Sequence, residues 1–254
     1  GYDLEILTRR FPEVRFLILR EEASAGERIN LGVIEARSPL VLVLWCDMKP
    51  EPWIFSPEAL EAALRQDLLC LVPQLKGSGG EVLPSMQIPA FIKGLLKLLP
   101  WKPVQPGMKS LFPYDYCGLY SSRKFLQLGG YDSWMVNPYW QKMDFGFRAL
   151  LWGERIQFQP RFHVGYVSDP PAEDSTPDAS YKAFYLKNLA VRFNGELGLL
   201  PLSRLPGYVL KSDTGLLYSI KEFREVRRWV HANRYRFKGE ASSLVSRWEM
   251  PDRR

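Results

Sequence analysis

The sequence has few of the features that mark disulfide-rich, secreted or membrane-spanning proteins. Its three cysteines, Cys46, Cys70 and Cys117, form no CxxC pair, and an odd number argues against a disulfide framework. The longest apolar stretches, such as residues 40–45, fall far short of the roughly 18 residues that span a bilayer. The N-terminus shows no charged segment followed by an apolar one. These absences favour a reduced, cytoplasmic protein that is soluble or peripheral to a membrane.

Nucleic-acid-binding motifs are also absent. No RNP, zinc-finger or helix-turn-helix pattern accompanies the positive charge of the chain. The net charge is +6, and residues 180–254 alone carry 15 Lys and Arg against 7 Asp and Glu. This basic C-terminal part predicts either a solvated helical surface or attraction to a polyanion. We do not expect nucleic acid to be that polyanion.

The first part of the chain alternates strand-like and helix-like segments, and its 46% hydrophobic content is enough for a sizeable core. Compact apolar runs predict strands, and apolar residues at helical spacing predict helices. We expect strands at 14–19, 40–45 and 68–72 and helices at 28–36 and 57–66. This order predicts an α/β fold with an open, mostly parallel sheet flanked by helices.

Residues 74–107 interrupt this alternation, because they contain five prolines and five glycines. Within them, residues 88–102 combine apolar side chains with Lys93, Lys97 and Lys102. This composition predicts either an amphipathic helix on a membrane surface or a segment that covers the sheet.

The α/β pattern then resumes and is followed by a second region. We expect strands at 115–120 and 156–167, the latter bent at Pro160, and helices at 122–128 and 141–152. Gly129 is placed to end its helix with a positive φ. The polar, proline-rich residues 169–178 predict a boundary between a core, residues 1–170, and a mainly helical, basic C-terminal extension, residues 171–254.

One segment carries a family resemblance. Residues 129–148 read GGYDSWMVNPYWQKMDFGFR, with a double glycine, an aromatic residue and an Asp, followed by an acidic residue four positions before an Arg. This order resembles the acceptor-side block of family 2 glycosyltransferases, which have the GT-A fold. The resemblance implies transfer of a sugar from a nucleotide-diphosphate donor to a glycan or lipid-linked acceptor, on or near the inner face of a membrane.

The resemblance covers about residues 5–168 and begins abruptly. Residues 3–11 are similar to the helix that leads into the third strand of the family, so the first strand and helix, which hold the nucleotide, have no counterpart. We therefore expect either a fragment or a trimmed domain that binds the donor in another way.

The acceptor-side block implies several site residues. Gly129, Gly130 and Tyr131 match the turn that shapes the acceptor pocket, and Trp140 offers a ring on which a sugar can stack. Arg148 matches the arginine that closes the block, where it can pair with a carboxylate one helical turn earlier.

The catalytic part of the same block departs from the family. The family has a Glu-Asp pair whose carboxylate is the general base, and here Gln141 and Lys142 occupy both positions. The remaining candidates for a base are Asp144, Asp132, and Lys142 with a pKa depressed by burial.

A donor-side motif is half present. Asp47 follows the apolar run 40–45 and matches the DxD aspartate that the family uses to bind Mn²⁺ or Mg²⁺ at the donor diphosphate. Trp45 replaces the first Asp. Upstream, Arg28 and Asn30 match the family's helix before this strand, and Arg28 either reaches the diphosphate or lies in solvent.

His163 lies near the position at which some family members carry a further metal ligand. The alternative is an ordinary core histidine, since Phe162 and Val164 flank it. The losses at Trp45, Gln141 and Lys142 also leave open a second function, a catalytically inactive module that binds a glycan or a protein partner.

Overall fold

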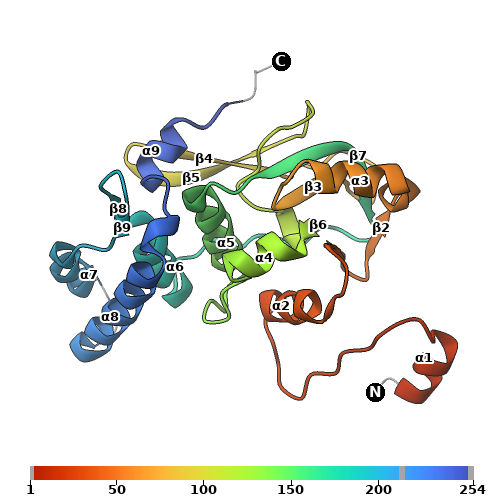
Figure 1. The fold of residues 1–254 in the computed structure, drawn as a ribbon, viewed down its shortest axis with the longest axis horizontal. Helices are drawn as coiled ribbons and strands as arrows, with labels where there is room; N and C mark the ends of the chain where they lie inside the picture. The colour runs from red at the N-terminus through yellow and green to blue at the C-terminus, as the bar shows by residue number, and fades with distance from the viewer. Residues whose placement is uncertain (1–2, 212–214, 251–254) are drawn as a thin grey trace.

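The computed structural model describes residues 3–211 and 215–250. Figure 1 shows a central sheet with helices packed on it, and the C-terminal helices beside it. Up to the middle of the chain the helices and strands are α1 (Leu4–Arg10), α2 (Ala25–Glu35), β1 (Leu40–Val43), β2 (Met48–Pro50), α3 (Pro57–Arg65), β3 (Cys70–Lys76), β4 (Met86–Ile92) and β5 (Leu95–Trp101). They are followed by β6 (Gly118–Ser121), α4 (Ser122–Leu128), α5 (Pro138–Trp152), β7 (Ile156–Tyr166), α6 (Ala179–Phe184), a π-helical turn (Tyr185–Leu189), β8 (Arg192–Phe193), β9 (Gly198–Leu199), α7 (Leu205–Lys211), α8 (Leu216–Ala232) and α9 (Ala241–Ser246).

The α/β fold is confirmed, but the directions of its strands differ from the prediction. In the described residues the main sheet has five strands in the order β1-β6-β3-β7-β2, and only β3 and β7 pair in parallel. The expectation of a mostly parallel sheet is therefore wrong. β1, β3 and β7 do run in one direction, but β6 lies between β1 and β3, and β2 pairs antiparallel with β7.

Two apolar segments do not form the predicted elements. Residues 14–19 form no strand and lie largely exposed in an extended segment between α1 and α2 (Figure 1). Residues 88–102 are not an amphipathic helix, because they belong to the hairpin of β4 and β5. Lys93 and Gly94 have φ values of 51° and 77°, which suits a tight two-residue hairpin turn. Leu96 and Leu98 pack inwards on either side of the exposed Lys97, a period of two that belongs to a strand.

Helix α5 is the central helix of the fold. It begins at Pro138, where the Asn137 side chain accepts hydrogen bonds from two backbone N–H groups, and ends at Gly153, which has a φ of 82°. Most of its residues are buried, which is typical of a helix covered on all sides. One side packs on the sheet through Phe145 and Ala149, and another packs on the C-terminal extension through Met143 and Phe147.

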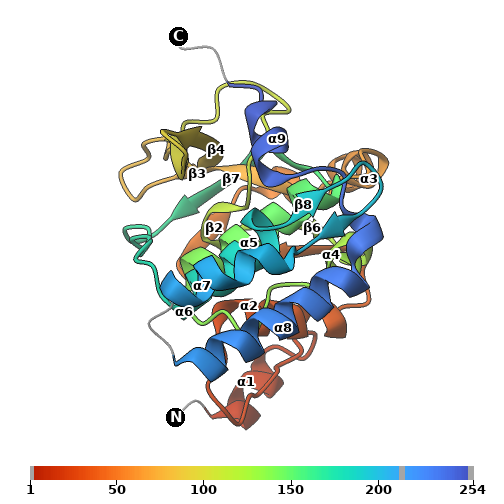
Figure 2. The same ribbon diagram turned by 90° about the vertical axis from the view of Figure 1, so that its left-hand side faces the viewer.

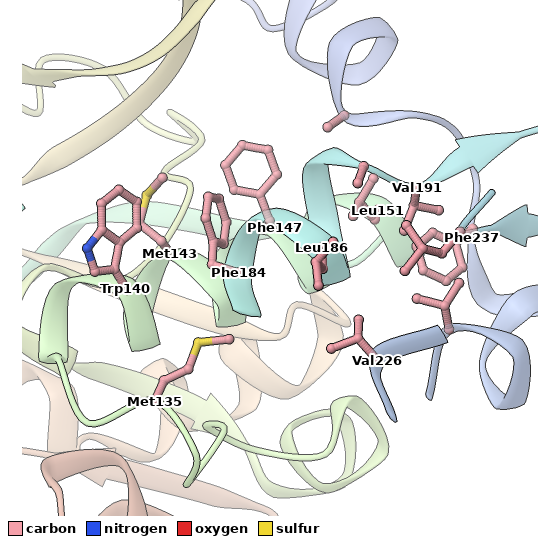
Figure 3. Packing of buried hydrophobic residues seen from close by; sticks show 14 of the residues in the cluster. Met135, Trp140, Met143, Phe147, Leu151, Phe184, Leu186, Val191, Val226 and Phe237 are labelled. Atoms are coloured by element: carbon pink, nitrogen blue, oxygen red, sulfur yellow. The ribbon is translucent and has the colours of Figure 1, made fainter. Parts of the chain in front are cut away.

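The C-terminal extension shares a hydrophobic core with α5. Phe184 and Leu186 meet Phe147 in this cluster, and Val226 of α8 closes it (Figure 3). Figure 2 shows α8 running across this side of the molecule, next to α6 and α7. Within the described ranges no helix is long and apolar enough to cross a bilayer.

A buried network of charges joins α5 to the extension. The carboxylate of Asp144 is fully buried and accepts hydrogen bonds from Arg148 Nε at 2.6 Å, Asn188 Nδ2 at 2.8 Å and Lys187 Nζ at 3.2 Å. Lys187 Nζ also lies 2.7 Å from Asp132 Oδ2. Burial alone raises the pKa of Asp144, but the charges of Arg148 and Lys187 outweigh it and hold this pKa below its usual value.

The double-glycine turn is held by two side chains. Asn30 on α2 donates to the carbonyl of Tyr131 at 2.7 Å and accepts from its N–H at 2.8 Å, and Arg148 donates to the carbonyl of Gly130 at 2.7 Å. Gly129 and Gly130 have φ values of 89° and 65°. A Cβ on Gly130 would lie 2.4 Å from Asn30 Oδ1, whereas a Cβ on Gly129 meets nothing closer than 3.9 Å.

We predict that Gly130→Ala lowers the free energy of unfolding by about 3 kcal/mol. About 1–2 kcal/mol is the cost of a left-handed non-glycine residue, and the remainder is the disturbed pair of hydrogen bonds from Asn30. Gly129→Ala is the matched control and should cost only the backbone part, about 1–2 kcal/mol. Urea unfolding measures both, and equal losses would show that Asn30 does not hold this turn.

Candidate functional site

The carboxyl ends of β1, β3 and β7 lie at one edge of the sheet. β1 and β3 are both antiparallel to the intervening β6, and β7 is parallel to β3. In open α/β sheets ligands bind at such an edge. Six side chains lie on or next to this edge and are called the edge site: Trp45, Asp47, Asp115, Lys142, Tyr166 and Glu173.

Asp47 and Trp45 follow β1, as the sequence predicts. The backbone carbonyl of Asp47 accepts from the N–H of Val167 at 2.8 Å, and its carboxylate accepts from the hydroxyl of Ser168 at 2.8 Å. The indole Nε1 of Trp45 donates to the carbonyl of Asp115 at 2.8 Å. Trp45 therefore fixes the backbone at the start of β6, and Asp47 stays half-buried at the sheet edge.

Asp115 was not singled out by the sequence. It and Tyr116 have φ values of 47° and 60°, and two successive left-handed residues without glycine cost roughly 1–3 kcal/mol each. The Asp115 carboxylate accepts from the hydroxyl of Tyr166 at 2.9 Å. Burial raises the pKa of this carboxyl more than the bond from Tyr166 lowers it. Strained backbone at a buried carboxylate is frequent at functional sites.

Lys142 points its ammonium group to the same edge. Nζ lies 2.6 Å from Glu173 Oε1 and 5.0 Å from the centre of the Tyr116 ring, and the side chain is 3% exposed. Glu173 belongs to residues 169–178, which cross this side of the molecule. Tyr114 donates to the carbonyl of Pro171 at 3.2 Å and holds this segment in place.

Gln141 is a structural residue with every hydrogen-bonding position occupied. Its Oε1 accepts from the N–H of Gly26 at 3.0 Å and from the hydroxyl of Tyr116 at 2.9 Å. Its Nε2 donates to Ser24 and to the carbonyls of Asp132 and Met135, at 3.2, 2.9 and 3.1 Å. The amide thus joins α2, α5 and the loop before α5, and a carboxylate would place a negative charge against two carbonyl oxygens.

The aromatic and glycine residues of the acceptor-side block are mostly part of the core. Tyr131 stacks on Phe145 with ring centres 4.3 Å apart, and its hydroxyl lies 2.8 Å from that of Tyr120. Trp140 packs on Tyr181 at 4.7 Å and donates from Nε1 to a backbone carbonyl. With Gly129, Gly130 and Arg148, which build the turn, these side chains shape the surroundings of the edge site and do not line it.

The other predicted catalytic carboxylates lie outside the edge site. Asp144 has both oxygens bonded within the buried network, and Asp132 accepts from Lys187 and from the N–H of Trp134. Neither is joined to an edge-site side chain by a hydrogen bond or an ion pair in the described part of the chain. Arg28 is exposed and donates to the carbonyl of Ala23, and Asn30 is engaged by the double-glycine turn.

His163 and Asp47 are not brought together. His163 Nδ1 lies 2.7 Å from Glu51 Oε2, and Lys76 Nζ lies 2.9 Å from Glu51 Oε1. The hydrogen bond from Lys76, followed by that of His163, holds the pKa of Glu51 below its usual value. His163 is four residues along β7 from Val167, the residue bonded to Asp47, and four strand residues span about 13 Å.

The described residues could hold a metal ion only together with phosphate groups of a substrate. Among residues 3–211 and 215–250 no group of three or more His, Cys, Asp or Glu side chains could hold a metal ion. Magnesium, however, is commonly held by one or two carboxylates together with substrate phosphates. Asp47 fits this donor set, because it supplies a half-buried carboxylate at the sheet edge.

Sequence reasoning missed Asp115, Tyr166 and Glu173. Asp115 was predicted as the first residue of a strand, although it lies in a tight turn before β6. Tyr166 ends β7, so its place at the carboxyl edge was available from the pattern of strands. Glu173 lies in the linker, and no local signal indicates that a linker residue contacts Lys142.

No family model and no curated protein matches the sequence. Solved structures do resemble it. GalNAc-T7, solved with UDP, GalNAc and Mn²⁺, matches with a TM-score of 0.55 and 12% identity over 97% of this chain and 48% of that one. S. aureus TarS 1-349, solved with UDP-GlcNAc, matches with a TM-score of 0.47 and 12% identity over 88% of this chain and 58% of that one.

Only the match to GalNAc-T7 has a TM-score above 0.5 among these structures, and it indicates the fold of this chain. At 12% identity the likeness concerns the fold alone, and this chain spans about half the length of GalNAc-T7. The chain therefore has a GT-A-like α/β fold, while membership of family 2 remains a prediction.

Proposed function

We propose that this chain is a glycosyltransferase that transfers a sugar from a nucleoside diphosphate to a glycan or lipid-linked acceptor. The observation that carries the proposal lies at the carboxyl edge of the sheet, where open α/β sheets bind ligands. Asp47 follows β1 there, Trp45 two residues earlier bonds to the backbone of Asp115, and the charge of Lys142 acts on the Asp115 carboxylate. A cytoplasmic location and a peripheral contact with the inner membrane face remain predictions.

The edge site offers the charges that this reaction needs. Asp47 would hold Mn²⁺ or Mg²⁺ together with the donor diphosphate, and the ion would neutralise the negative charge that develops there. Lys142 supplies a buried positive charge at the same edge. The acceptor oxygen bonds to the anomeric carbon, the bond from that carbon to the diphosphate breaks, and the leaving group takes the electron pair.

The acceptor proton requires a base, and the edge site contains two suitable carboxylates. Asp115 is buried and has a raised pKa, and Glu173 lies beside Lys142. We assign the role to one of these two and not to Asp132 or Asp144, because the latter two lie outside the edge site and Asp144 has both oxygens bonded within the buried network.

A second function is favoured by one observation. Gln141 is locked into five hydrogen bonds at a position where the family resemblance implies a catalytic carboxylate. The same fold can therefore serve as an inactive module that binds a glycan or a protein. Sugar transfer, or hydrolysis of a nucleotide sugar, by the purified chain excludes this alternative.

We predict that UDP binds in the presence of Mn²⁺ and that Asp47→Asn weakens this binding at least tenfold, because a metal ligand is lost. Isothermal titration calorimetry measures both affinities. Glu61→Gln removes one negative charge from the surface of α3 and should leave binding unchanged. A wild-type chain that does not bind UDP contradicts the proposed function, and equal binding by Asp47→Asn contradicts only the role of Asp47.

We also predict that Gln141→Glu destabilises the fold by about 3 kcal/mol or more, since the new carboxylate loses the donated hydrogen bonds and is buried without a cationic partner. Chemical denaturation measures the loss. Gln66→Glu, at the exposed end of α3, should change stability by no more than about 0.5 kcal/mol. A stable Gln141→Glu protein with increased transfer activity would show that position 141 accepts a catalytic base.

A further inference from the structure

A cavity of about 420 Å³ lies beside the edge site. It is open on one side and is lined by the β4–β5 hairpin, by Tyr114 before β6, by Tyr139 at the start of α5, and by residues 170–173 and 175. Its volume is within the range of small-molecule sites. Glu173 lines it and also pairs with Lys142, so the cavity and the edge site share a side chain.

The cavity contains an amide without a partner. Gln87 of β4 is 6% exposed, and the side-chain amide makes no hydrogen bond to any described residue. The amide atoms are open to the cavity and not sealed in the core, and a polar group in a cavity wall without a protein partner is free to bond to a ligand or to a water. The backbone N–H of Gln87 donates to Ser110 Oγ at 3.0 Å, and its carbonyl accepts from the N–H of Leu111 at 2.8 Å. The base of the side chain is therefore held in a fixed place.

The remaining wall indicates a neutral, hydroxylated ligand. Two tyrosine rings, Tyr114 and Tyr139, stand among proline and leucine side chains, and no lysine or arginine is among the described residues that line the cavity. A nucleoside diphosphate would lack a counter-charge here. Aromatic rings pack on the apolar faces of sugars, while an amide and a carboxylate bond to their hydroxyl groups.

We propose that this cavity binds a sugar residue of the acceptor, with Gln87 and Glu173 holding hydroxyl groups and the two tyrosines packing on the ring. That this sugar belongs to the acceptor rests on the proposed function, whereas the sugar site itself rests on the observed cavity. Because Glu173 reaches both the cavity and Lys142, an acceptor bound here presents a hydroxyl to the edge site.

The test uses methyl glycosides of glucose, galactose and N-acetylglucosamine, whose binding is measured by saturation-transfer NMR and titration. At least one should bind, and Gln87→Leu should weaken it about tenfold, the value of one hydrogen bond from a neutral amide. Because the replaced amide has no partner, the variant should unfold at the same temperature or higher. The loss of binding is then not a loss of folding.

Ser85→Ala is the matched control. Ser85 lies two residues before Gln87, is buried, and likewise has a polar side chain without a partner. Unlike Gln87, it does not line the cavity. This variant should keep full glycoside binding. The proposal is overturned if no glycoside binds the wild type, if both variants lose binding equally, or if only a proline-rich peptide or a polyprenyl lipid competes for the cavity.

UDP titrations on the same samples separate the two proposals. UDP binding without glycoside binding overturns the proposal that the cavity binds a sugar and leaves the proposed function intact. Glycoside binding without UDP binding overturns the proposed function and leaves a sugar-binding module. Gln87→Leu should bind UDP as the wild type does, since within the described residues Gln87 makes no hydrogen bond to Asp47 or Trp45 of the edge site.

Discussion

The buried carboxylate of Asp144 is the interaction on which the rest of the structure depends. Burying a charge is unfavourable unless it is paired and hydrogen-bonded, and here the partners come from two parts of the chain. Arg148 lies one turn along α5 and also bonds to the double-glycine turn, whereas Lys187 and Asn188 come from the C-terminal extension. One carboxylate therefore fixes the position of α5, of the turn and of the extension together. The same two parts of the chain, α5 and the extension, also share a hydrophobic core.

Sequence patterns predicted the elements whose causes are local. The helix at 122–128 has the predicted bounds because Ser121 caps it and Gly129 ends it with a positive φ. The helix predicted at 57–66 also has local causes, because Ser56 caps it and Pro57 is its first residue. Strand direction was not predicted correctly, because it depends on which strands become neighbours, and β6 enters between β1 and β3 from far along the sequence. The apolar segment at 14–19 shows the same limit, since a run of strand-forming residues becomes a strand only when a partner strand lies beside it.

The candidate site shows the same contrast between residues with a local signal and residues that depend on distant contacts. Asp47 was predicted because its signal is local, an acidic residue after a buried strand. Asp115, Glu173 and Gln87 were not, because each matters through a contact with a residue far away in the sequence or through a cavity that several segments enclose. The acceptor-side block illustrates the opposite case. Its matching residues are present, yet Tyr131 and Trp140 are packed in the core and the glycines build a turn, so a motif that identifies the fold need not identify the reacting groups.

The two replacements in this block have different physical consequences. A carboxylate at position 141 would disrupt the contact between α2, α5 and the loop before α5. The Gln141 Nε2 donates to two backbone carbonyls, and a negatively charged oxygen in its place would be repelled by them. Lys142 is the reverse case, because a buried cation beside the aromatic ring of Tyr116 requires an anion from elsewhere. Glu173 supplies that anion from the segment that crosses the sheet edge. The carboxylate at this edge is therefore carried by residues 169–178 and not by α5, so its position depends on how that segment is placed.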